Sequence, residues 1–362
     1  MNVPRGVRHL VTLRQISEVT GFSSATISRV LNNDPSMSVS EATRSKILEA
    51  AGKLQYKSRN YSSKSKTRYI GEVNRHIAIA EMLSLTEQLW DPYYLFLKNY
   101  AAQACIENGV DVTYLISEGE SYRWPERPVD GVLAIGIFSE AQVNNLAAFC
   151  PNLVFLDSSP DDERYDAVVP NLSLGIRQAL DYLTDKGHRR IGFLGPRCKL
   201  DEKKRTAPEV RRQRYIEYMK DRGLFQADLL LDAEKVDFNV WDIVGKRLKA
   251  KEPFPTALVA YNEETALATV GALRAAGLSV PGDVSLISFN DTPLSQLSEP
   301  SLTSVCAHVD TMSERAVKLL LERMVEPSDV PCKMVLPTSV AERGSVAAIG
   351  EAGQREIRAV QP

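Results

Sequence analysis

The sequence is poor in the residues that build metal centres and disulfide frameworks. Its 362 residues include four histidines, which lie far apart from one another, and five cysteines. The cysteines are scattered, odd in number and never in a Cys-x-x-Cys pair. We therefore expect neither a metal site nor a disulfide scaffold, and free thiols are typical of a reducing, cytoplasmic compartment.

Long apolar runs are missing as well. No stretch approaches the length needed to cross a bilayer, and residues 1–16 carry charges throughout rather than the apolar core of a secretory signal. The chain also lacks a phosphate-binding loop, and the polar candidates discussed below include no serine or cysteine nucleophile with a histidine partner. We therefore expect no membrane partner, no cofactor and no catalytic residues.

Charge is distributed unevenly along the chain, although the formal net charge is only −2. Residues 1–68 hold twelve Lys and Arg against four Asp and Glu, whereas the remaining residues hold 32 against 42. A basic head on an acidic body indicates a polyanionic partner for the head alone. A solvated basic tail would give the same totals, so the choice depends on the pattern inside the head.

The head contains the start and stop signals of three short helices. Thr12 and Gln15 have the spacing of a capping box, and Gly21 can end the helix in the left-handed conformation. A serine caps a second helix over residues 25–31, and a further capping box at residues 38–41 opens a longer helix. Such an arrangement is typical of a helix-turn-helix module. The apolar face expected for the first helix consists of Leu13, Ile16 and Val19.

The second helix has the shape needed to enter a DNA groove. Ile27, Val30 and Leu31 fall on one side of it. The opposite side is slim, because its residues other than arginine are small, and the arginine offers a forked donor to the edge of a guanine. A solvated helix in any small bundle is the alternative interpretation. The residues on the outer side are Ser24, Ala25, Ser28 and Arg29.

Residues 57–75 are interpreted as a linker. The segment from residue 57 to residue 68 is rich in serine, basic and free of acidic residues, which is typical of a flexible connection. It separates the helix-turn-helix head, residues 1–56, from a body that we place at residues 76–345. Residues 346–362 are too short and irregular for a coiled coil and are interpreted as a tail.

The body alternates strand-like apolar runs with amphipathic helices in two successive series. Repeated strand–helix–strand units predict two parallel sheets flanked by helices, and therefore an α/β body of two lobes like that of periplasmic binding proteins. We assign about 76–169 and 308–335 to lobe one, and about 170–306 and 336–345 to lobe two. The strand-like runs are residues 77–80, 112–116, 131–135, 153–156, 190–194, 257–260 and 284–289.

Polar residues follow several of these runs. In parallel sheets, ligands bind beyond the carboxyl ends of the strands, and with two lobes the cleft between them is the expected place. Aspartate, asparagine and arginine can hold vicinal hydroxyls, and Phe238 or Trp241 can cover the apolar face of a sugar. For any one residue a helix cap or a turn is the competing explanation. The candidates are Asp157, Arg211, Asn262, Glu263, Asn290 and Asp291.

Two other classes of protein share part of this pattern. A periplasmic sugar-binding protein has a two-lobed body, but it carries a signal peptide in place of a basic helix-turn-helix head. A sugar-acting enzyme would pair carboxylates, with Asp157 beside Asp291 or Glu263. Nothing in the sequence supports the separation or the raised pKa that such a pair requires. We therefore favour a DNA-binding regulator over both.

Residues 11–16, 21–32 and Tyr56 are similar to the head of the lactose/galactose repressor family of bacterial transcription regulators. In that family the linker folds on DNA into a hinge helix whose leucine wedges into the minor groove. The family's proline and leucine positions hold Ser58 and Ser65 here, which places that insertion in doubt. The resemblance implies base contacts from Ser24, Ala25 and Arg29, and phosphate contacts from the Leu13 backbone, Thr26, Ser28 and Asn32.

The body resembles the same family, notably at residues 187–195 and 281–285. The family's Asn-Asp pair reads Asn262-Glu263 here, and asparagine replaces an aspartate at position 290, which turns a pure acceptor into a mixed donor and acceptor. A different set of ligand hydroxyls is therefore expected. The resemblance places Asp157, Arg211, Asn262 and Asn290 at sugar-contacting positions and Phe238 at the stacking position.

These patterns predict a cytoplasmic repressor that binds double-stranded, palindromic operator DNA as a homodimer. The resemblance implies a small-molecule effector, a sugar of galactoside type, that releases the repressor from DNA. A non-sugar ligand, or a corepressor that strengthens DNA binding, would use the same architecture.

Overall fold

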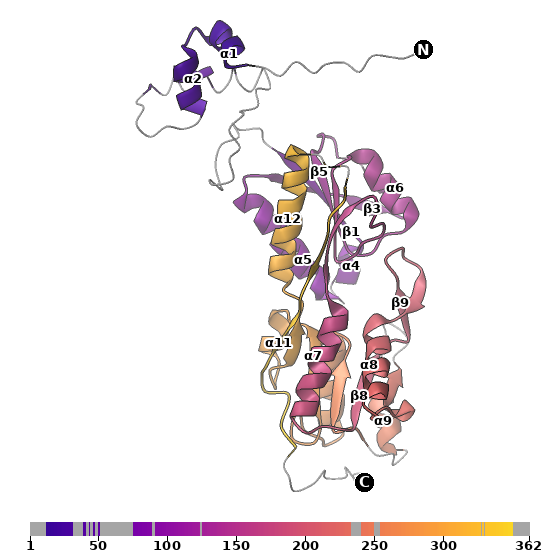
Figure 1. The fold of residues 1–362 in the computed structure, drawn as a ribbon. Coiled ribbons are helices and arrows are strands. Elements are labelled where there is room, and N and C mark those ends of the chain that lie inside the picture. Colours follow the sequence, from indigo (N-terminus) through magenta and orange to yellow (C-terminus); the bar gives the residue numbers. More distant parts are fainter. Residues whose placement is uncertain are drawn as a thin grey trace. The chain divides into compact units, whose positions relative to one another are not determined.

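The computed structural model divides into two compact units, Met1–Asn74 and Arg75–Pro362 (Figure 1). The predictions made for Asn32, Tyr56, Phe238, the linker and residues 350–362 concern positions outside the part of the chain that the structure describes. The described residues are 12–31, 39–40, 43, 46–47, 50, 75–88, 91–123, 125–232, 240–249, 254–326, 328 and 330–349.

Helices α1 (Leu13–Thr20) and α2 (Ser24–Leu31) form the described core of the head. Gln15 Oε1 accepts a hydrogen bond from the Thr12 backbone at 2.8 Å, as the predicted capping box requires. Gly21 ends α1 with a φ of 77°, the left-handed conformation predicted for it. The hydroxyl of Ser23 accepts from the Thr26 backbone at 3.1 Å and so caps α2.

The third helix begins later than the sequence suggested. The Ser40 hydroxyl accepts from the backbone N–H of Thr43 at 3.2 Å, and residues 43, 46–47 and 50 are helical, so Ser40 caps this helix. The prediction for Val19 was wrong, because its side chain is 62% exposed. Thr20 is buried in its place and donates its hydroxyl to the Ile16 carbonyl, which satisfies the polar group. The buried cluster consists of Ile16, Ile27, Val30, Ile47 and Ala50.

Lobe one is built on a parallel sheet of six strands in the order β15-β7-β6-β5-β1-β2. Helices α5 (Pro92–Glu107) and α12 (Val309–Val325) pack on one face, and α6 (Glu140–Phe149) packs on the other (Figure 1). Because both faces are covered, the central strands are continuous apolar runs. The strands are β1 (His76–Glu81), β2 (Asp111–Tyr114), β5 (Gly131–Ile135), β6 (Leu153–Leu156), β7 (Asp166–Pro170) and β15 (Lys333–Leu336).

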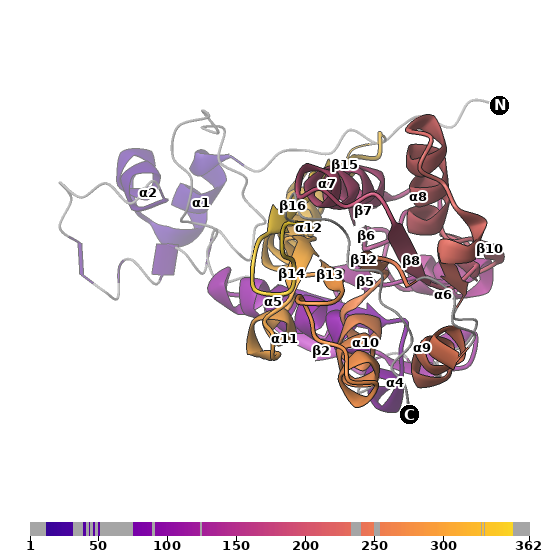
Figure 2. The ribbon, with the colours of Figure 1, turned by 90° about the horizontal axis from the view of Figure 1, so that it is seen from below.

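Lobe two repeats this plan with the strand order β11-β8-β12-β13-β14-β16, of which only β16 is antiparallel to its neighbour. Helices α7 (Leu172–Asp185) and α8 (Val210–Asp221) lie on one side of the sheet, and α9 (Val240–Lys249) and α10 (Glu263–Ala275) on the other (Figure 2). The strands are β8 (Ile191–Gly195), β11 (Leu230–Asp232), β12 (Ala257–Ala260), β13 (Ser285–Asn290), β14 (Thr303–Cys306) and β16 (Ser339–Ala341).

The chain passes between the lobes three times, after β7, after β14 and after β15. The passages are joined by hydrogen bonds: Asn171 donates its backbone N–H to the Leu336 carbonyl at 2.8 Å, and the His308 ring lies 3.1 Å from the Ser339 hydroxyl. The connection between the lobes is therefore a group of bonded strands rather than a single tether.

Short elements complete the described structure. The hairpin of β9 and β10 leaves lobe two on the side of α6 (Figures 1 and 2). No helix in the described ranges is both long and apolar enough to span a bilayer. The short elements are α4 (Leu85–Gln88), β3 (Ile116–Glu118), β4 (Ser121–Arg123), β9 (Cys198–Leu200), β10 (Thr206–Pro208), a 3-10 turn (Ala227–Leu229) and α11 (Pro293–Leu297).

Candidate functional site

The outer face of α2 is exposed, as the sequence predicted. Ser24, Ala25 and Arg29 are exposed, while Ile27 and Val30 are buried on the opposite side. Two further residues with predicted DNA contacts, Thr26 and Ser28, are partly buried at the edge of this face. Leu13, the first residue of α1, is also partly buried, and helix N-termini present backbone donors to anions. The face can therefore place small side chains and one arginine against a groove.

Asp157 forms the centre of the lobe-one side of a polar cluster. It follows β6 directly, with a φ of 77°, and its Oδ1 accepts a hydrogen bond from the Tyr93 hydroxyl at 2.7 Å. Burial raises the pKa of Asp157 to about 6, and this effect outweighs the Tyr93 hydrogen bond and the charge of Lys199, which both lower it. The carboxylate is therefore held ready to accept from a ligand, at a cost in desolvation.

Asp91 and Tyr94 belong to the same side of the cluster as Asp157. Asp91 precedes α5, whose first residue is a proline, and burial raises the pKa of the Asp91 carboxyl although the charge of Lys199 opposes the effect. The rings of Tyr93 and Tyr94 meet edge to face, with their centroids 5.2 Å apart. Lobe one therefore contributes carboxylates and phenol hydroxyls.

Arg211 forms the centre of the lobe-two side. It lies in the first turn of α8 and is buried, with its Nε donating to Glu209 at 2.7 Å and its Nη1 donating to the Tyr261 carbonyl at 2.5 Å. The guanidinium also lies over the rings of Tyr261 and Phe289, at 5.1 and 5.5 Å from their centroids. These contacts fix the position of the cation before any ligand arrives.

Lys199 and Glu264 extend the lobe-two side. Lys199 is carried by β9, and its ammonium lies 5.3 Å from the centre of the Tyr261 ring. The residue as a whole is exposed, yet desolvation and the charge of Arg211 lower the pKa of Lys199. Burial raises the pKa of Glu264 to about 8. Lobe two therefore adds a second cation and a further carboxyl.

The two sides belong to one cluster, because the charges on one lobe act on groups of the other. Lys199 of lobe two lowers the pKa of both Asp91 and Asp157 of lobe one, and Asp91 raises the pKa of Glu264. The charge of Asp157 also acts on Arg211, and the sequence proposed each of these two residues on its own. The cluster offers acceptors and donors on facing walls, an arrangement suited to a ligand rich in hydroxyl groups.

The two asparagines predicted as ligand residues each follow an aromatic residue of this cluster. Asn262 follows Tyr261 and Asn290 follows Phe289, the two residues whose rings contact Arg211. The Asn262 side chain accepts from the Thr265 backbone at 3.0 Å, so it also caps α10. The alternative aromatic cover, Trp241, lies instead against Gly271 of α10 in the outer layer of lobe two, with 51% of its surface exposed.

Glu263 and Asp291, the two carboxylates proposed as possible enzymatic partners of Asp157, are used elsewhere. Glu263 is fully buried and accepts from the Thr292 backbone at 2.9 Å and from the Ser295 hydroxyl at 2.5 Å. Asp291 accepts from Arg343 at 2.6 Å. Both therefore stabilise lobe two, and neither forms a pair with Asp157.

Sequence reasoning missed Lys199, Glu264, Asp91 and Tyr93 as individual site residues. Asp91 before a proline reads as a helix cap, and Lys199 lies in a polar stretch without strand periodicity. Glu264 is one of two successive glutamates at the start of a helix, where negative charge is ordinary. None of these positions carries a local pattern that separates a ligand contact from a surface charge.

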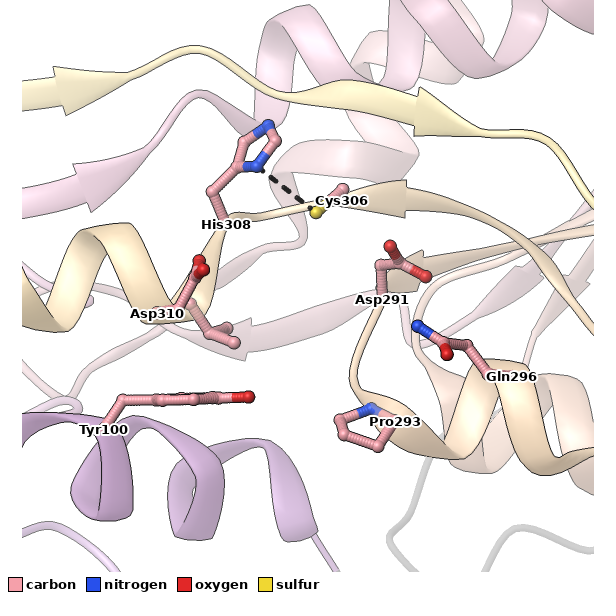
Figure 3. Close-up of a pocket in the computed structure, with 8 residues that line it drawn as sticks. Tyr100, Asp291, Pro293, Gln296, Cys306, His308 and Asp310 are labelled. Atoms are coloured by element: carbon pink, nitrogen blue, oxygen red, sulfur yellow. Dashed lines mark hydrogen bonds between the residues drawn. The ribbon is translucent and has the colours of Figure 1, made fainter. Parts of the chain in front are cut away.

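A separate hollow of about 200 Å³ lies where the second passage meets α5 and α11 (Figure 3). Tyr100 on α5 points toward Pro293, and the Cys306 thiol lies 3.5 Å from Nδ1 of His308. Asp291 on its wall is already paired with Arg343. Within the described ranges, no group of His, Cys, Asp and Glu is arranged to hold a metal ion.

The head and the body both match known protein families. Residues 12–59 match the model for bacterial regulatory proteins of the lacI family, and residues 180–346 match a periplasmic binding protein-like domain. The HTH-type transcriptional regulator GanR of Bacillus subtilis (strain 168) is 32% identical over 323 residues, which cover 87% of this chain and 93% of that protein. The ribose operon repressor of Escherichia coli (strain K12) is 27% identical, with 93% and 100% covered.

Solved structures show the same architecture. The lac repressor dimer bound to operator and the anti-inducer ONPF has a TM-score of 0.60 at 22% identity, covering 94% of this chain and 100% of that one. A LacI family regulator from Enterococcus faecium with bound ribose has a TM-score of 0.62 at 21% identity, covering 76% and 100%. The fold class predicted from the sequence is confirmed.

The chain belongs to the lacI family of bacterial regulatory proteins, as its head and body had suggested. It is a helix-turn-helix transcriptional regulator with a two-lobed α/β body.

Proposed function

We propose that this regulator is a repressor whose homodimer binds a palindromic operator through α2 of each chain and is released when a sugar occupies the cleft between the lobes. The observation that carries the proposal is the buried polar cluster formed by Asp157 of lobe one, which accepts from Tyr93, and Arg211 of lobe two, which donates to Glu209 and on which the charge of Asp157 acts. A ligand held by both lobes prefers one arrangement of them, and that preference is the source of coupling to DNA.

The DNA-reading role rests on the exposed face of α2. Arg29 can donate two hydrogen bonds to a guanine, with Ser24 and Ala25 beside it at the base edges. Thr26, Ser28 and the Leu13 backbone contact phosphates in this proposal, and Asn32 remains a predicted phosphate contact. A twofold-symmetric dimer presents two such helices, and a palindrome follows from that symmetry.

The effector-binding role rests on the cluster between the lobes. Asp157 and Arg211 hold sugar hydroxyls, Asn262 and Asn290 complete the hydrogen bonds from the strand ends, and Phe238 remains the predicted stacking residue. Two proteins of similar fold have been solved in complex with ribose and with cellobiose. A galactoside-type sugar is our proposal for this chain, and the regulator is proposed to act in the cytoplasm without catalytic activity.

Arg29→Lys tests the reading helix, because it keeps the charge and removes the forked donor. We expect the variant to lose about 10- to 100-fold in affinity for the operator while its affinity for random DNA stays within about twofold. Fluorescence anisotropy on the DNA upstream of the gene, with a scrambled duplex as reference, measures both. If affinity falls equally for the operator and the scrambled duplex, Arg29 does not contact the bases.

The same titration, repeated with a panel of mono- and disaccharides, tests the effector. A sugar that weakens operator binding supports the inducer role, whereas a sugar that strengthens it identifies a corepressor. Sedimentation of the operator complex gives the number of chains. Turnover of a labelled galactoside by the purified protein would contradict the proposal that the cleft only binds.

A further inference from the structure

Three carboxylate oxygens in the cleft are buried without a hydrogen-bond donor among the residues that the structure describes. They are Oδ1 of Asp91 and both oxygens of Glu264. Most buried polar atoms in proteins have a partner, because an unpaired acceptor loses its water without compensation. Three such atoms in one cluster therefore indicate groups that a bound molecule completes.

These oxygens come from opposite walls of the cleft. Asp91 stands before α5 in lobe one, and Glu264 is the second residue of α10 in lobe two, just beyond the carboxyl end of β12. Burial raises the pKa of both carboxyls, and at Glu264 the charge of Asp91 adds to this effect.

A cation faces both carboxyls from the hairpin of β9 and β10. The charge of Lys199 acts on Asp91 and on Glu264. The hairpin itself crosses from lobe two to lobe one, where Lys204 Nζ donates to Gln142 Oε1 at 3.1 Å and Glu202 lies 3.8 Å from Lys333 (Figure 1). Lys199 is therefore held over the cleft by an element anchored on both lobes.

We infer that Asp91, Glu264 and Lys199 form a specificity subsite for an uncharged, hydroxyl-rich part of the effector. Hydroxyl groups donate to the three unpartnered oxygens, and a hydroxyl oxygen accepts from the Lys199 ammonium. The inference rests on the proposed effector cleft and adds to it a second set of contacts, distinct from those of Asp157 and Arg211.

The charge balance selects this class of ligand over charged ones. A phosphorylated or carboxylated sugar brings further acceptors and negative charge to Asp91 and Glu264, which leaves the three oxygens unpaired. An ammonium group would satisfy them, but it would approach Lys199 and Arg211, whose charges already act on each other. Hydroxyl groups supply donors without adding charge of either sign.

Binding of this kind releases a proton near neutral pH. In the ligand-free cleft the pKa of Glu264 is about 8, because of burial and the charges of Asp91 and Glu263, which the Lys199 charge only partly offsets. Hydroxyl donors favour the ionised carboxylate and lower that pKa. Sugar affinity should therefore rise with pH up to about 8, and the proton released should appear in calorimetry.

The experiment compares the full-length protein with Glu264→Gln, Asp91→Asn and a matched control, Glu140→Gln, whose glutamate is exposed on α6. The probes are galactose, glucose, lactose and cellobiose, together with the 6-phosphate and 2-amino forms of both monosaccharides. Affinity and proton release are measured by calorimetry at pH 6 and pH 8 in two buffers of different ionisation enthalpy. Melting temperatures are recorded for every variant.

We expect a neutral sugar to bind the wild-type protein with proton release, and its 6-phosphate to bind at least about 100-fold more weakly. Glu264→Gln and Asp91→Asn should each weaken the neutral sugar by about 10- to 100-fold, and Glu264→Gln should also remove most of the proton release at pH 7 to 8. Glu140→Gln should match the wild type. The melting temperature of Glu264→Gln should not fall, because the change removes a buried carboxyl group whose oxygens have no partner within the described part of the ligand-free protein.

Two results would overturn the subsite. One is a phosphorylated or amino sugar that binds as tightly as its neutral parent, and the other is a Glu264→Gln variant with wild-type affinity and proton release. In both cases a neutral sugar that still releases the wild-type protein from its operator would leave the proposed function standing. If no probe binds and none alters operator affinity, both proposals fail together.

Discussion

The two lobes share one architecture and differ in the chemistry of the side chains that follow their strands. Each has a six-stranded, mainly parallel sheet between two layers of helices. Lobe one contributes Asp91, Tyr93 and Asp157 to the polar cluster, whereas lobe two contributes two cations, Arg211 and Lys199, and a single carboxyl, Glu264. The sheet therefore sets where a ligand can bind, and the residues after the strands set which groups it must offer.

The lobes also differ in how firmly these groups are held. Asp157 accepts hydrogen bonds from the phenol hydroxyls of Tyr93 and Tyr94, whereas Arg211 is bound by the carboxylate of Glu209, the Tyr261 carbonyl and two aromatic rings. A group held by several buried partners contributes to folding as well as to binding. Substitutions in the two lobes should therefore differ in how much they lower the free energy of unfolding.

Arg211→Ala should have the largest effect. It leaves Glu209, which is 3% exposed, as a buried charge without its partner, and we expect the free energy of unfolding to fall by about 3–5 kcal/mol together with loss of the sugar response. Urea unfolding and operator release measure the two effects. The control is Arg214→Ala on the same helix, whose pair with Glu217 is half exposed, and which should lose less than about 1 kcal/mol. If Arg211→Ala also loses less than about 1 kcal/mol, lobe two does not hold its site residue more firmly than lobe one does.

Tyr93→Phe should have an intermediate effect that depends on pH. Without its 2.7 Å donor, the pKa of Asp157 rises above its value of about 6, so a larger share of the carboxyl is protonated at a given pH. We expect sugar affinity at pH 7 to fall about tenfold, with a greater loss at pH 6 than at pH 8. Calorimetry across this range tests it, with Tyr100→Phe on the same helix as the control. If the pH dependence of sugar affinity is unchanged in Tyr93→Phe, the Tyr93 hydroxyl does not set the pKa of Asp157.

Lys204→Ala should have the smallest effect. The change removes the 3.1 Å hydrogen bond from the hairpin of β9 and β10 to Gln142 of lobe one. Because the lysine is partly solvated, we expect sugar to dissociate only about twofold faster, with stability changed by less than about 0.5 kcal/mol. Stopped-flow fluorescence measures the rate, and Lys203→Ala, its exposed neighbour, is the control. Equal rates in both variants would show that the hairpin does not retain the ligand.

The apolar strands could be predicted from the sequence, and the short polar strands could not. Runs such as residues 131–135 and 153–156 are apolar at every position because helices bury both faces. By contrast β14 reads Thr-Ser-Val-Cys and is buried only through tertiary partners, such as the Ser345 hydroxyl that accepts from the Thr303 backbone. Short polar strands of this kind carry no local signal of burial.

The candidate site shows the same limit. Asp157 and Arg211 follow a clear rule, the position after a strand or at the start of a helix beyond it, and the structure brings them into one cluster. Glu263 follows a strand by the same rule, yet it is turned toward Thr292 and Ser295 within lobe two. The direction in which a side chain points depends on α11, which the sequence does not reveal locally. A position directly after a strand therefore indicates a candidate site residue, but it does not show whether the side chain points into the site.

The three passages between the lobes have a consequence for synthesis of the protein. Lobe one obtains its edge strand from residues 333–336 and lobe two obtains its own from residues 339–341, although both sheets begin far earlier in the chain. Ser345 and Ala347 then bond to the Leu286 and Ser285 positions of β13. A ribosome must therefore release nearly the whole body before either sheet is complete. Nascent chains cut before residue 333 should leave two unfinished sheet edges, each open to pairing with another chain.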